Sequence, residues 1–455
     1  MKEWQERDLR YIWHPCSQMK DYEEYPPIVI SHGKGAYLYD LEGKAYLDAI
    51  SSWWVNLFGH GNERIGRALK AQVDRLEHVI FSHFSHEPAI ELAEKLVKIT
   101  PPGLSKVFFA DNGSSAVEIA LKLSFHYHQQ TGNKRKTRFA AISDAYHGET
   151  LGALSVGDID LYSRIYKPLL FNALRIPGPN CFRCPFGKER TTCDAECFST
   201  LEDMVSREAE ELSGVIIEPI VQCAAGMKIY SPRYLSKLRD LCNRLHIHFI
   251  ADEIAVGFGR TGKMFACEHA GVGPDIMCLS KGISGGYLPL SVVLVTEEIY
   301  QAFYAEYTEL KAFLHSHSYT GNALACACAL ETLRIFEEED VLKKNESKAK
   351  FMNDLALRLL GSHPHVGEFR QIGMIGAIEL VDDREKKRPF DWRDRVGYKI
   401  YRLALGKGVI LRPLGDVIYF MPPYCVEEED IALMVNTAAQ AMDEYFSLRD
   451  KGLVS

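Results

Sequence analysis

Short apolar runs alternate with amphipathic stretches through the middle of the chain. This alternation is typical of a parallel α/β sheet whose strands are covered by helices. Two stretches predict helices most clearly, residues 87–99 and the stretch after Ser231-Pro232, because their apolar residues recur at helical spacing. The strands predicted between the helical patterns are Val107–Ala110, Arg138–Ile142, Gly214–Glu218, His248–Asp252 and Ile276–Leu279.

The two ends of the chain follow a different pattern. The runs 36–40 and 45–48 flank a glycine-containing turn and predict a β-hairpin. After about residue 330 the pattern becomes helix, short strands, helix. A chain of 455 residues is too long for one compact core. We therefore predict a large domain over residues 61–329, with a smaller α+β domain made from residues 1–60 and 330–455.

Composition narrows the class of protein. A net charge of −8 provides no basic surface for wrapping DNA or RNA, so a nucleic-acid partner is not expected. No apolar stretch approaches the roughly 20 residues that span a bilayer. The charged N-terminus lacks an apolar signal core, which predicts a cytoplasmic protein whose twelve cysteines are mostly reduced thiols.

A predicted strand, Val107–Ala110, runs into the turn Gly113-Ser114-Ser115, which precedes a helix predicted over 116–128. Free N–H groups at a helix start, the dipole and two hydroxyls together make a cradle for a phosphate group. The alternative is that Ser114 only caps the helix. Because the chain has no nucleotide-binding G-x-x-x-x-G-K-[ST] run, the phosphate would belong to a cofactor rather than to ATP.

Two charged residues follow predicted strands downstream. Asp252 ends a buried strand, at the edge where ligands bind in parallel sheets, and a carboxylate there can keep a pyridine nitrogen protonated. Lys281 stands between an apolar strand and the glycine-rich run 282–286. Desolvation there would lower its pKa toward use as a nucleophile. Taken alone, Asp252 is more typical of a helix cap or a salt bridge, but the phosphate turn and Lys281 favour one shared cofactor.

An aromatic residue follows another predicted strand. Tyr146 could stack on a flat cofactor ring, although a lone tyrosine at a strand end is more often part of the core. Its place between the phosphate turn and the two charged residues favours stacking.

These motifs together resemble the class III (ω-amino) aminotransferases of fold type I, over nearly the whole chain. The most specific stretch is residues 252–263 followed by Ser280-Lys281-Gly282. The resemblance implies an α/β fold and a pyridoxal 5'-phosphate cofactor. It further implies the roles of five residues: Lys281 carries the cofactor and relays a proton, Asp252 pairs with the pyridine nitrogen, Tyr146 stacks on the ring, and Gly113 and Ser114 bind the phosphate.

The run 315–322, His-Ser-His-Ser-Tyr-Thr-Gly-Asn, is similar to the family segment that reaches the cofactor phosphate of a neighbouring subunit. Ser318 stands where the family usually has threonine, and it keeps the hydroxyl. The resemblance therefore implies a homodimer with shared active sites.

Within the class, three runs are similar to the branch that aminates a keto acid in biotin synthesis: residues 12–15, residues 51–54, and residues 411–416 with Tyr419. The resemblance implies that Trp53, Tyr146 and Tyr419 line the substrate pocket and that Arg412 holds the substrate carboxylate. A guanidinium group suits this task because it can bind a carboxylate through two parallel hydrogen bonds.

Two positions leave the amino donor open between adenosylmethionine and lysine. Family members that use adenosylmethionine have tyrosine where this chain has Cys16 and aspartate where it has Glu149. Members that use lysine share the His-Ser-Tyr-Thr-Gly-Asn run, which favours lysine here.

Four cysteines lie close together in a loop rich in proline and glycine: Cys181, Cys184, Cys193 and Cys197. They could bind a structural zinc ion, or they could be loop thiols without metal, which is the reading we adopt. Three alternative functions follow: a racemase or mutase on the same scaffold, a class III enzyme for a different ω-amine, and a nucleic-acid zinc module. The acidic net charge speaks against the last of these.

Overall fold

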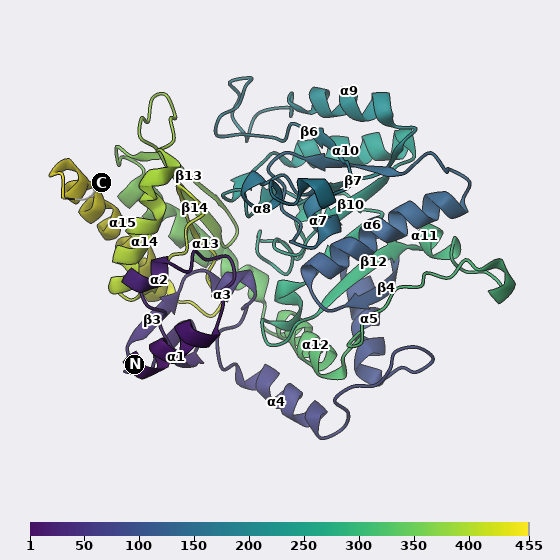
Figure 1. Cartoon of the computed structure of the whole chain (residues 1–455), viewed down its shortest axis with the longest axis horizontal. Helices are drawn as coiled ribbons and strands as arrows, with labels where there is room; N and C mark the ends of the chain where they lie inside the picture. The colour runs from purple at the N-terminus through teal and green to yellow at the C-terminus, as the bar shows by residue number, and fades with distance from the viewer. Residues whose placement is uncertain (454–455) are drawn as a thin grey trace.

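A computed structural model describes residues 1–453 of the chain. A seven-stranded sheet, in the order β4-β12-β11-β10-β7-β5-β6, forms the centre of the larger part of the molecule (Figure 1). From β11 to β6 all neighbouring strands are parallel, and β12 is antiparallel to both β11 and β4. This sheet confirms the predicted α/β architecture. Its strands are β4 (Leu104–Ala110), β5 (Arg138–Ile142), β6 (Leu174–Ile176), β7 (Leu212–Ile217), β10 (His248–Asp252), β11 (Ile276–Leu279) and β12 (Ser291–Thr296).

Side chains of this sheet alternate between two apolar cores on its opposite faces. In β10, for example, Ile250 packs into the core under helix α6, whereas Phe249 and Ala251 belong to the core on the other face. The period of two follows from the geometry of a strand, and burial on both faces explains why these strands are apolar throughout. The helices around the sheet are α5 (Glu87–Ile99), α6 (Gly113–Gln130), α9 (Phe198–Glu208), α10 (Pro232–Leu245) and α12 (Ala323–Glu338).

The smaller part of the molecule contains both termini (Figure 1). The predicted hairpin is present as β2 (Tyr37–Asp40) and β3 (Ala45–Asp48), and β3 pairs in parallel with β15 (Val409–Ile410). Segments far apart in the sequence therefore share one sheet. The other elements of this smaller part are β1 (Ile30–Lys34), β13 (Val366–Ile372), β14 (Ile375–Leu380), β16 (Val417–Phe420), α13 (Val341–Leu360), α14 (Val396–Gly406) and α15 (Glu428–Asp450).

The domain limits at 60/61 and 329/330 stay predictions, and the second of them falls inside α12.

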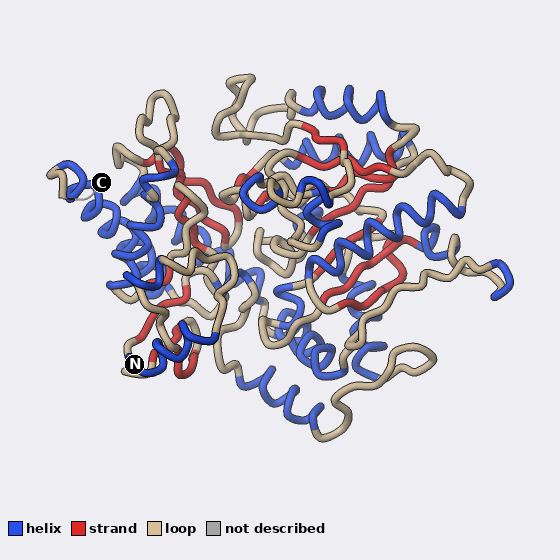
Figure 2. The backbone as a smooth tube through the Cα atoms, in the orientation of Figure 1, coloured by secondary structure: helices blue, strands red, loops and turns tan. Residues whose placement is uncertain are grey.

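Within residues 1–453, no helix has the length and apolar character needed to cross a membrane. The loops that join the two parts are visible in Figure 2. The remaining short elements are α1 (Lys2–Tyr11), α2 (Asp21–Glu24), α3 (Ser51–Trp54), α4 (Glu63–Val73), α7 (Leu151–Val156), α8 (Asp160–Ser163), α11 (Glu297–Gln301), β8 (Val221–Gln222), β9 (Lys228–Ile229) and five 3-10 turns at 167–169, 266–269, 281–284, 307–309 and 392–394.

Candidate active site

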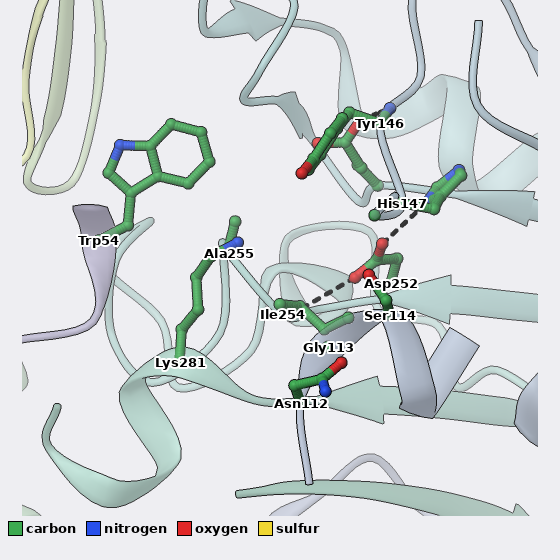
Figure 3. A pocket seen from close by; sticks show the side chains of 12 residues that line it. Trp54, Asn112, Gly113, Ser114, Tyr146, His147, Asp252, Ile254, Ala255 and Lys281 are labelled. Carbon is green, nitrogen blue, oxygen red and sulfur yellow. Dashed lines mark hydrogen bonds and ion pairs between the residues drawn. The ribbon is translucent and has the colours of Figure 1, made fainter. Parts of the chain in front are cut away.

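A cavity opens where the carboxyl end of β10 meets the first turn of α6 and the segment after β11 (Figure 3). The structure thus brings together five of the residues predicted from the sequence. The lining residues are Trp54, Asn112, Gly113, Ser114, Tyr146, His147, Gly148, Glu218, Asp252, Ile254, Ala255 and Lys281.

Asp252 lies on the floor of this cavity and is neither a helix cap nor part of a surface salt bridge. Its Oδ2 is 2.7 Å from Nδ1 of His147, and its Oδ1 accepts the backbone N–H of Ile254 at 3.1 Å (Figure 3). Both side chains are buried. The imidazole and the backbone N–H therefore hold the carboxylate in one orientation. Sequence reasoning missed His147, although it stands beside Tyr146.

Lys281 extends from the segment after β11 toward Asp252 and the ring of Trp54 (Figure 3). Its Nζ lies 4.9 Å from the centre of that ring and has no hydrogen bond or ion pair with any residue among 1–453. Burial lowers the pKa of Lys281, and the negative charge of Asp252 opposes this shift. Removal from water disfavours the ammonium form, so the amine becomes available as a nucleophile at a lower pH than that of an ordinary lysine.

The first turn of α6 forms another wall. Asn112 caps the helix by accepting the backbone N–H of Ser115 at 3.0 Å. Ser114 is therefore not the cap, and its Oγ instead accepts the backbone N–H of Glu149 at 3.1 Å. The close approach requires glycine at position 148, because a Cβ there would lie 1.9 Å from Oγ of Ser114. The leading N–H groups of a helix have no partner within it and can bind an anion.

Glu218 is buried on the remaining side of the cavity. Its Oε1 accepts the backbone N–H of Tyr146 at 3.0 Å, and its Oε2 accepts that of Cys223 at 2.9 Å. Burial raises the pKa of Glu218 to about 7. The carboxyl group thus ties the loop that carries Tyr146 to the loop after β7. The sequence carries no local signal for this residue, because a glutamate that follows an apolar strand has no distinctive neighbours.

A second cavity, of about 640 Å³, continues from the first and shares Trp54, Tyr146 and Lys281 with it. Its size suits a small-molecule substrate. Its other lining residues come from the N-terminal segment, the 146–162 segment and the loop after β15, and they include Cys16, Trp53, Glu149, Tyr162 and Arg412.

Besides Lys281, this second cavity is lined by one basic and one acidic side chain, those of Arg412 and Glu149. The guanidinium of Arg412 stacks over the ring of Trp53 at 4.0 Å and donates to the backbone oxygen of Cys16 at 3.3 Å. Oε1 of Glu149 accepts the Tyr146 hydroxyl at 3.0 Å and the Cys16 thiol at 3.6 Å. Burial and the charge of Glu149 raise the pKa of Cys16. The cavity can therefore receive a molecule with both a carboxylate and an ammonium group.

The two tryptophans that line the second cavity belong to an unusual turn. The residues of α3, from Ser51 to Trp54, all have positive φ, between 46° and 74°. Residues other than glycine rarely adopt this left-handed backbone conformation, which costs roughly 1–2 kcal/mol per residue. Trp54 donates from Nε1 to the hydroxyl of Tyr419 at 3.0 Å. Tyr419 is buried behind Trp54 and does not line either cavity in the described structure.

Ser318 is not brought to either cavity. It is exposed in the segment between α11 and α12, where its backbone oxygen is 2.7 Å from Nε2 of His78. The same segment carries other exposed residues with large apolar side chains: Tyr304, Tyr307, Leu310, Leu314 and Tyr319.

The four loop cysteines line one small cavity together with Lys188 and Arg190. Each thiol is free. Over the described part of the chain, no three His, Cys, Asp or Glu side chains are arranged to hold a metal ion. The choice between a structural zinc site and thiols without metal stays a prediction.

The fold and the site define an enzyme class that comparison with known proteins identifies. The family model Aminotransferase class-III matches residues 18–442. The chain belongs to the class III aminotransferases, which are enzymes that use pyridoxal phosphate.

Individual relatives are similar over their full length. The chain is 48% identical over 437 residues to an adenosylmethionine-8-amino-7-oxononanoate aminotransferase of Geobacter sulfurreducens, covering 96% of each chain. A protein of the same name from Methanocaldococcus jannaschii has a crystal structure that superposes with a TM-score of 0.92 at 40% identity, covering 97% of this chain and 99% of the other. An omega transaminase from Pseudomonas jessenii in complex with PMP superposes with a TM-score of 0.93 at 32% identity, covering 98% and 99%.

Proposed function

We propose that the chain transfers an amino group to 8-amino-7-oxononanoate, giving 7,8-diaminononanoate in biotin synthesis. One observation carries this proposal: Lys281 and Arg412 line one continuous cavity in a chain that is 48% identical to the relative named for this substrate. A reactive amine at one end and a guanidinium group at the other suit a keto acid whose carboxylate lies at the far end of its chain from the keto group.

The residues of the first cavity fit pyridoxal phosphate. The amine of Lys281 has no hydrogen bond or ion pair among the described residues, and Asp252 offers a buried carboxylate to a pyridine nitrogen. The first turn of α6, at Gly113 and Ser114, would hold the phosphate, and Tyr146 would stack on the ring. When bound, the cofactor stores the amino group between the two half-reactions and acts as an electron sink.

The protein residues then have separate tasks. The amine of Lys281 would take a proton from the carbon that bears the amino group of the donor. In the second half-reaction it would deliver a proton to the carbon that receives the amino group, so it acts as base and then as acid. Asp252, oriented by His147 Nδ1, would direct its carboxylate at the pyridine nitrogen of the bound cofactor. Because one amino group is carried between two substrates, we expect ping-pong kinetics.

In the second cavity, Arg412 would bind the carboxylate of the keto acid, and Trp53 would cover its hydrocarbon chain. Trp53 is 39% exposed, so its ring is available for contact. Tyr419 would act from behind Trp54 by holding the indole through the 3.0 Å hydrogen bond. Glu149 places a carboxylate near the position where an amino group must enter.

For the donor we propose adenosylmethionine, because the relatives that are 48% identical carry it in their names. The lysine favoured by the 315–322 run is the competing outcome. Both donors are cations with a carboxylate, so the charges of Glu149 and Arg412 suit either of them.

We further propose a cytoplasmic homodimer with shared active sites. The exposed apolar residues of the segment that carries Ser318 support a partner surface, since in a monomer these side chains would face water. The partner's copy of this segment would bring its serine hydroxyl to the phosphate end of the first cavity. All twelve cysteines are free, which supports a reducing compartment.

The test is mass-spectrometric detection of 7,8-diaminononanoate from 8-amino-7-oxononanoate, run separately with adenosylmethionine and with lysine. Product with adenosylmethionine alone supports the whole proposal, and product with lysine alone changes only the donor. If protein that carries its cofactor forms no product with either donor, the biotin assignment is wrong. The enzyme is then a class III aminotransferase for another ω-amine.

A further inference from the structure

We propose that Asp48 is a positioning residue that holds the left-handed turn Ser51–Trp54 and thereby sets the positions of the two indole rings that line the second cavity. This inference deepens the proposed function, on which its kinetic test rests. It concerns a residue that lines neither cavity.

Asp48 is buried at the end of β3 and uses both carboxylate oxygens on this turn. Its Oδ1 accepts the backbone N–H of Ser52 at 2.9 Å and that of Ile50 at 3.4 Å. Its Oδ2 accepts the Ser52 hydroxyl at 2.7 Å and lies 3.0 Å from Nε2 of His60. Ser52 is thus bound to one carboxylate through both its backbone and its side chain.

The protonation of His60 follows from its other neighbour. The side chain of Asn56 accepts the backbone N–H of Gly59 through Oδ1, so its amide nitrogen faces Nδ1 of His60 at 3.1 Å. Nδ1 must accept from this amide, which leaves the proton on Nε2. A neutral His60 therefore donates to Asp48, and the carboxylate has four donors. This set of partners is complete only for an aspartate.

The strain of the turn explains why it needs such an anchor. Four consecutive residues without glycine are in the left-handed region, with φ of 51°, 46°, 74° and 72°. Such conformations persist only where the surroundings determine them, and they are concentrated at functional sites. Other contacts hold the first and last residues of the turn. Ser51 Oγ donates to the backbone oxygen of Met421 at 2.7 Å, and Arg260 donates to the backbone oxygen of Trp54 at 3.2 Å.

The conformation of the turn decides where two indole rings point. Trp54 faces Lys281, whose Nζ is 4.9 Å from the ring centre (Figure 3). The guanidinium of Arg412 stacks on the ring of Trp53, with its Cζ 4.0 Å from the ring centre. A relaxed turn would redirect both side chains, because the direction of a side chain follows the backbone dihedrals. Asp48 therefore acts on substrate binding through Trp53 and Trp54 without contacting the substrate.

The test compares Asp48→Asn with Asp40→Asn. Asp40 is the matched control, since it is also buried and accepts two backbone N–H groups, those of Glu42 and Lys44, and one hydroxyl, that of Tyr46. No residue of the turn 40–44 lines either cavity. Both variants should lower the thermal unfolding temperature. Only Asp48→Asn should raise the KM for 8-amino-7-oxononanoate, by roughly 10- to 100-fold, the loss expected when a binding group moves by about 1 Å.

Two further measurements separate positioning from general damage. The near-ultraviolet circular dichroism of the holoenzyme should change in Asp48→Asn and not in Asp40→Asn, because it reports the fixed packing of the indole rings. Adding Ser52→Gly to Asp48→Asn should lower the raised KM part of the way back to the wild-type value, since glycine adopts positive φ without strain. Failure of this rescue, or an equal KM for Asp48→Asn and the wild type, overturns the proposal.

If Asp48→Asn does not fold, Ser52→Ala gives the same test by removing the hydroxyl bond alone, and a variant with wild-type KM and wild-type circular dichroism overturns the proposal. Failure of the proposed function has a different signature. The wild-type enzyme would then form no diamine from this keto acid, while the circular dichroism comparison would still test the role of Asp48.

Discussion

Nδ1 of His147 lies 2.7 Å from Oδ2 of Asp252, and both side chains are buried beneath the cavity that Lys281 enters. The pair joins the loop after β5 to the end of β10, two segments that are 105 residues apart. A buried carboxylate that must direct its charge at one point depends on such a partner, because few other groups can hold its orientation.

We therefore expect His147→Asn to slow catalysis more than it weakens substrate binding. Losing a hydrogen bond to a buried charged group costs about 1–3 kcal/mol, so kcat should fall roughly 5- to 150-fold. His128→Asn is the control, because His128 is equally buried and its Nε2 lies 3.0 Å from a backbone oxygen, that of Ser213, in another part of the core. Steady-state kinetics of both variants check this, and equal kcat values would contradict it.

Lys281 has a second predicted signature besides its role in turnover. Lys281→Ala should abolish multiple turnovers, since no other lysine lines the two cavities among the described residues. It should also remove the visible absorbance that a lysine-bound cofactor gives to the protein. Absorbance spectroscopy with single- and multiple-turnover assays tests both points. Multiple turnovers by Lys281→Ala, with that absorbance retained, would show that the assignment is wrong.

The convergence of these residues could be predicted largely from the sequence. Asp252 and Lys281 follow apolar runs that were recognisable as strands, and strands that run parallel bring their carboxyl ends to one edge of a sheet. The phosphate turn was predictable for the same reason, because Gly113 and Ser114 follow another strand of that sheet. Local patterns therefore sufficed where the function depends on a strand end.

Other features depend on contacts between distant segments and leave no local signal. Strand β12 was not predicted, since the apolar run Ser291–Thr296 does not reveal that it pairs antiparallel between β11 and β4. The left-handed turn at Ser51–Trp54 contains none of the glycine or asparagine residues that usually mark positive φ. The position of Tyr419 behind Trp54 likewise follows from the pairing of β16 with β14.

The buried carboxyl group of Glu218 should make stability depend on pH. Burial raises its pKa from 4.5 to about 7, so the folded state binds a proton that the unfolded state releases. Between these two values stability falls as the pH rises, by at most roughly 3 kcal/mol for one group. Below pH 4.5 both states are protonated and the contribution is constant.

Glu218→Gln cannot ionise and should reduce this dependence, although it also loses one of the two backbone hydrogen bonds. Thermal unfolding of the wild type and the variant between pH 4 and pH 8 gives the comparison. Glu253→Gln is a matched variant outside the cavity, because burial raises the pKa of Glu253 to about 7 as well and its carboxylate also accepts two backbone N–H groups. A pH dependence that is the same in Glu218→Gln and the wild type would contradict the assignment.

Arg412 should determine the affinity for the keto acid rather than the rate of the chemical steps. Its guanidinium is held over Trp53 at 4.0 Å and reaches the second cavity, beyond the residues that contact the cofactor end. Arg412→Ala should raise the KM for 8-amino-7-oxononanoate roughly 10- to 100-fold, with a smaller change in kcat. This factor corresponds to the loss of a charge-assisted hydrogen bond of about 1.5–3 kcal/mol.

Arg412→Lys should recover only part of the affinity, because an ammonium group cannot bind a carboxylate through two parallel bonds or stack flat on an indole ring. Arg393→Lys, at an exposed arginine paired with Asp391, should leave both constants unchanged. If Arg412→Ala lowers kcat and leaves KM as it is, the guanidinium acts in the transfer itself and the carboxylate of the substrate is bound elsewhere.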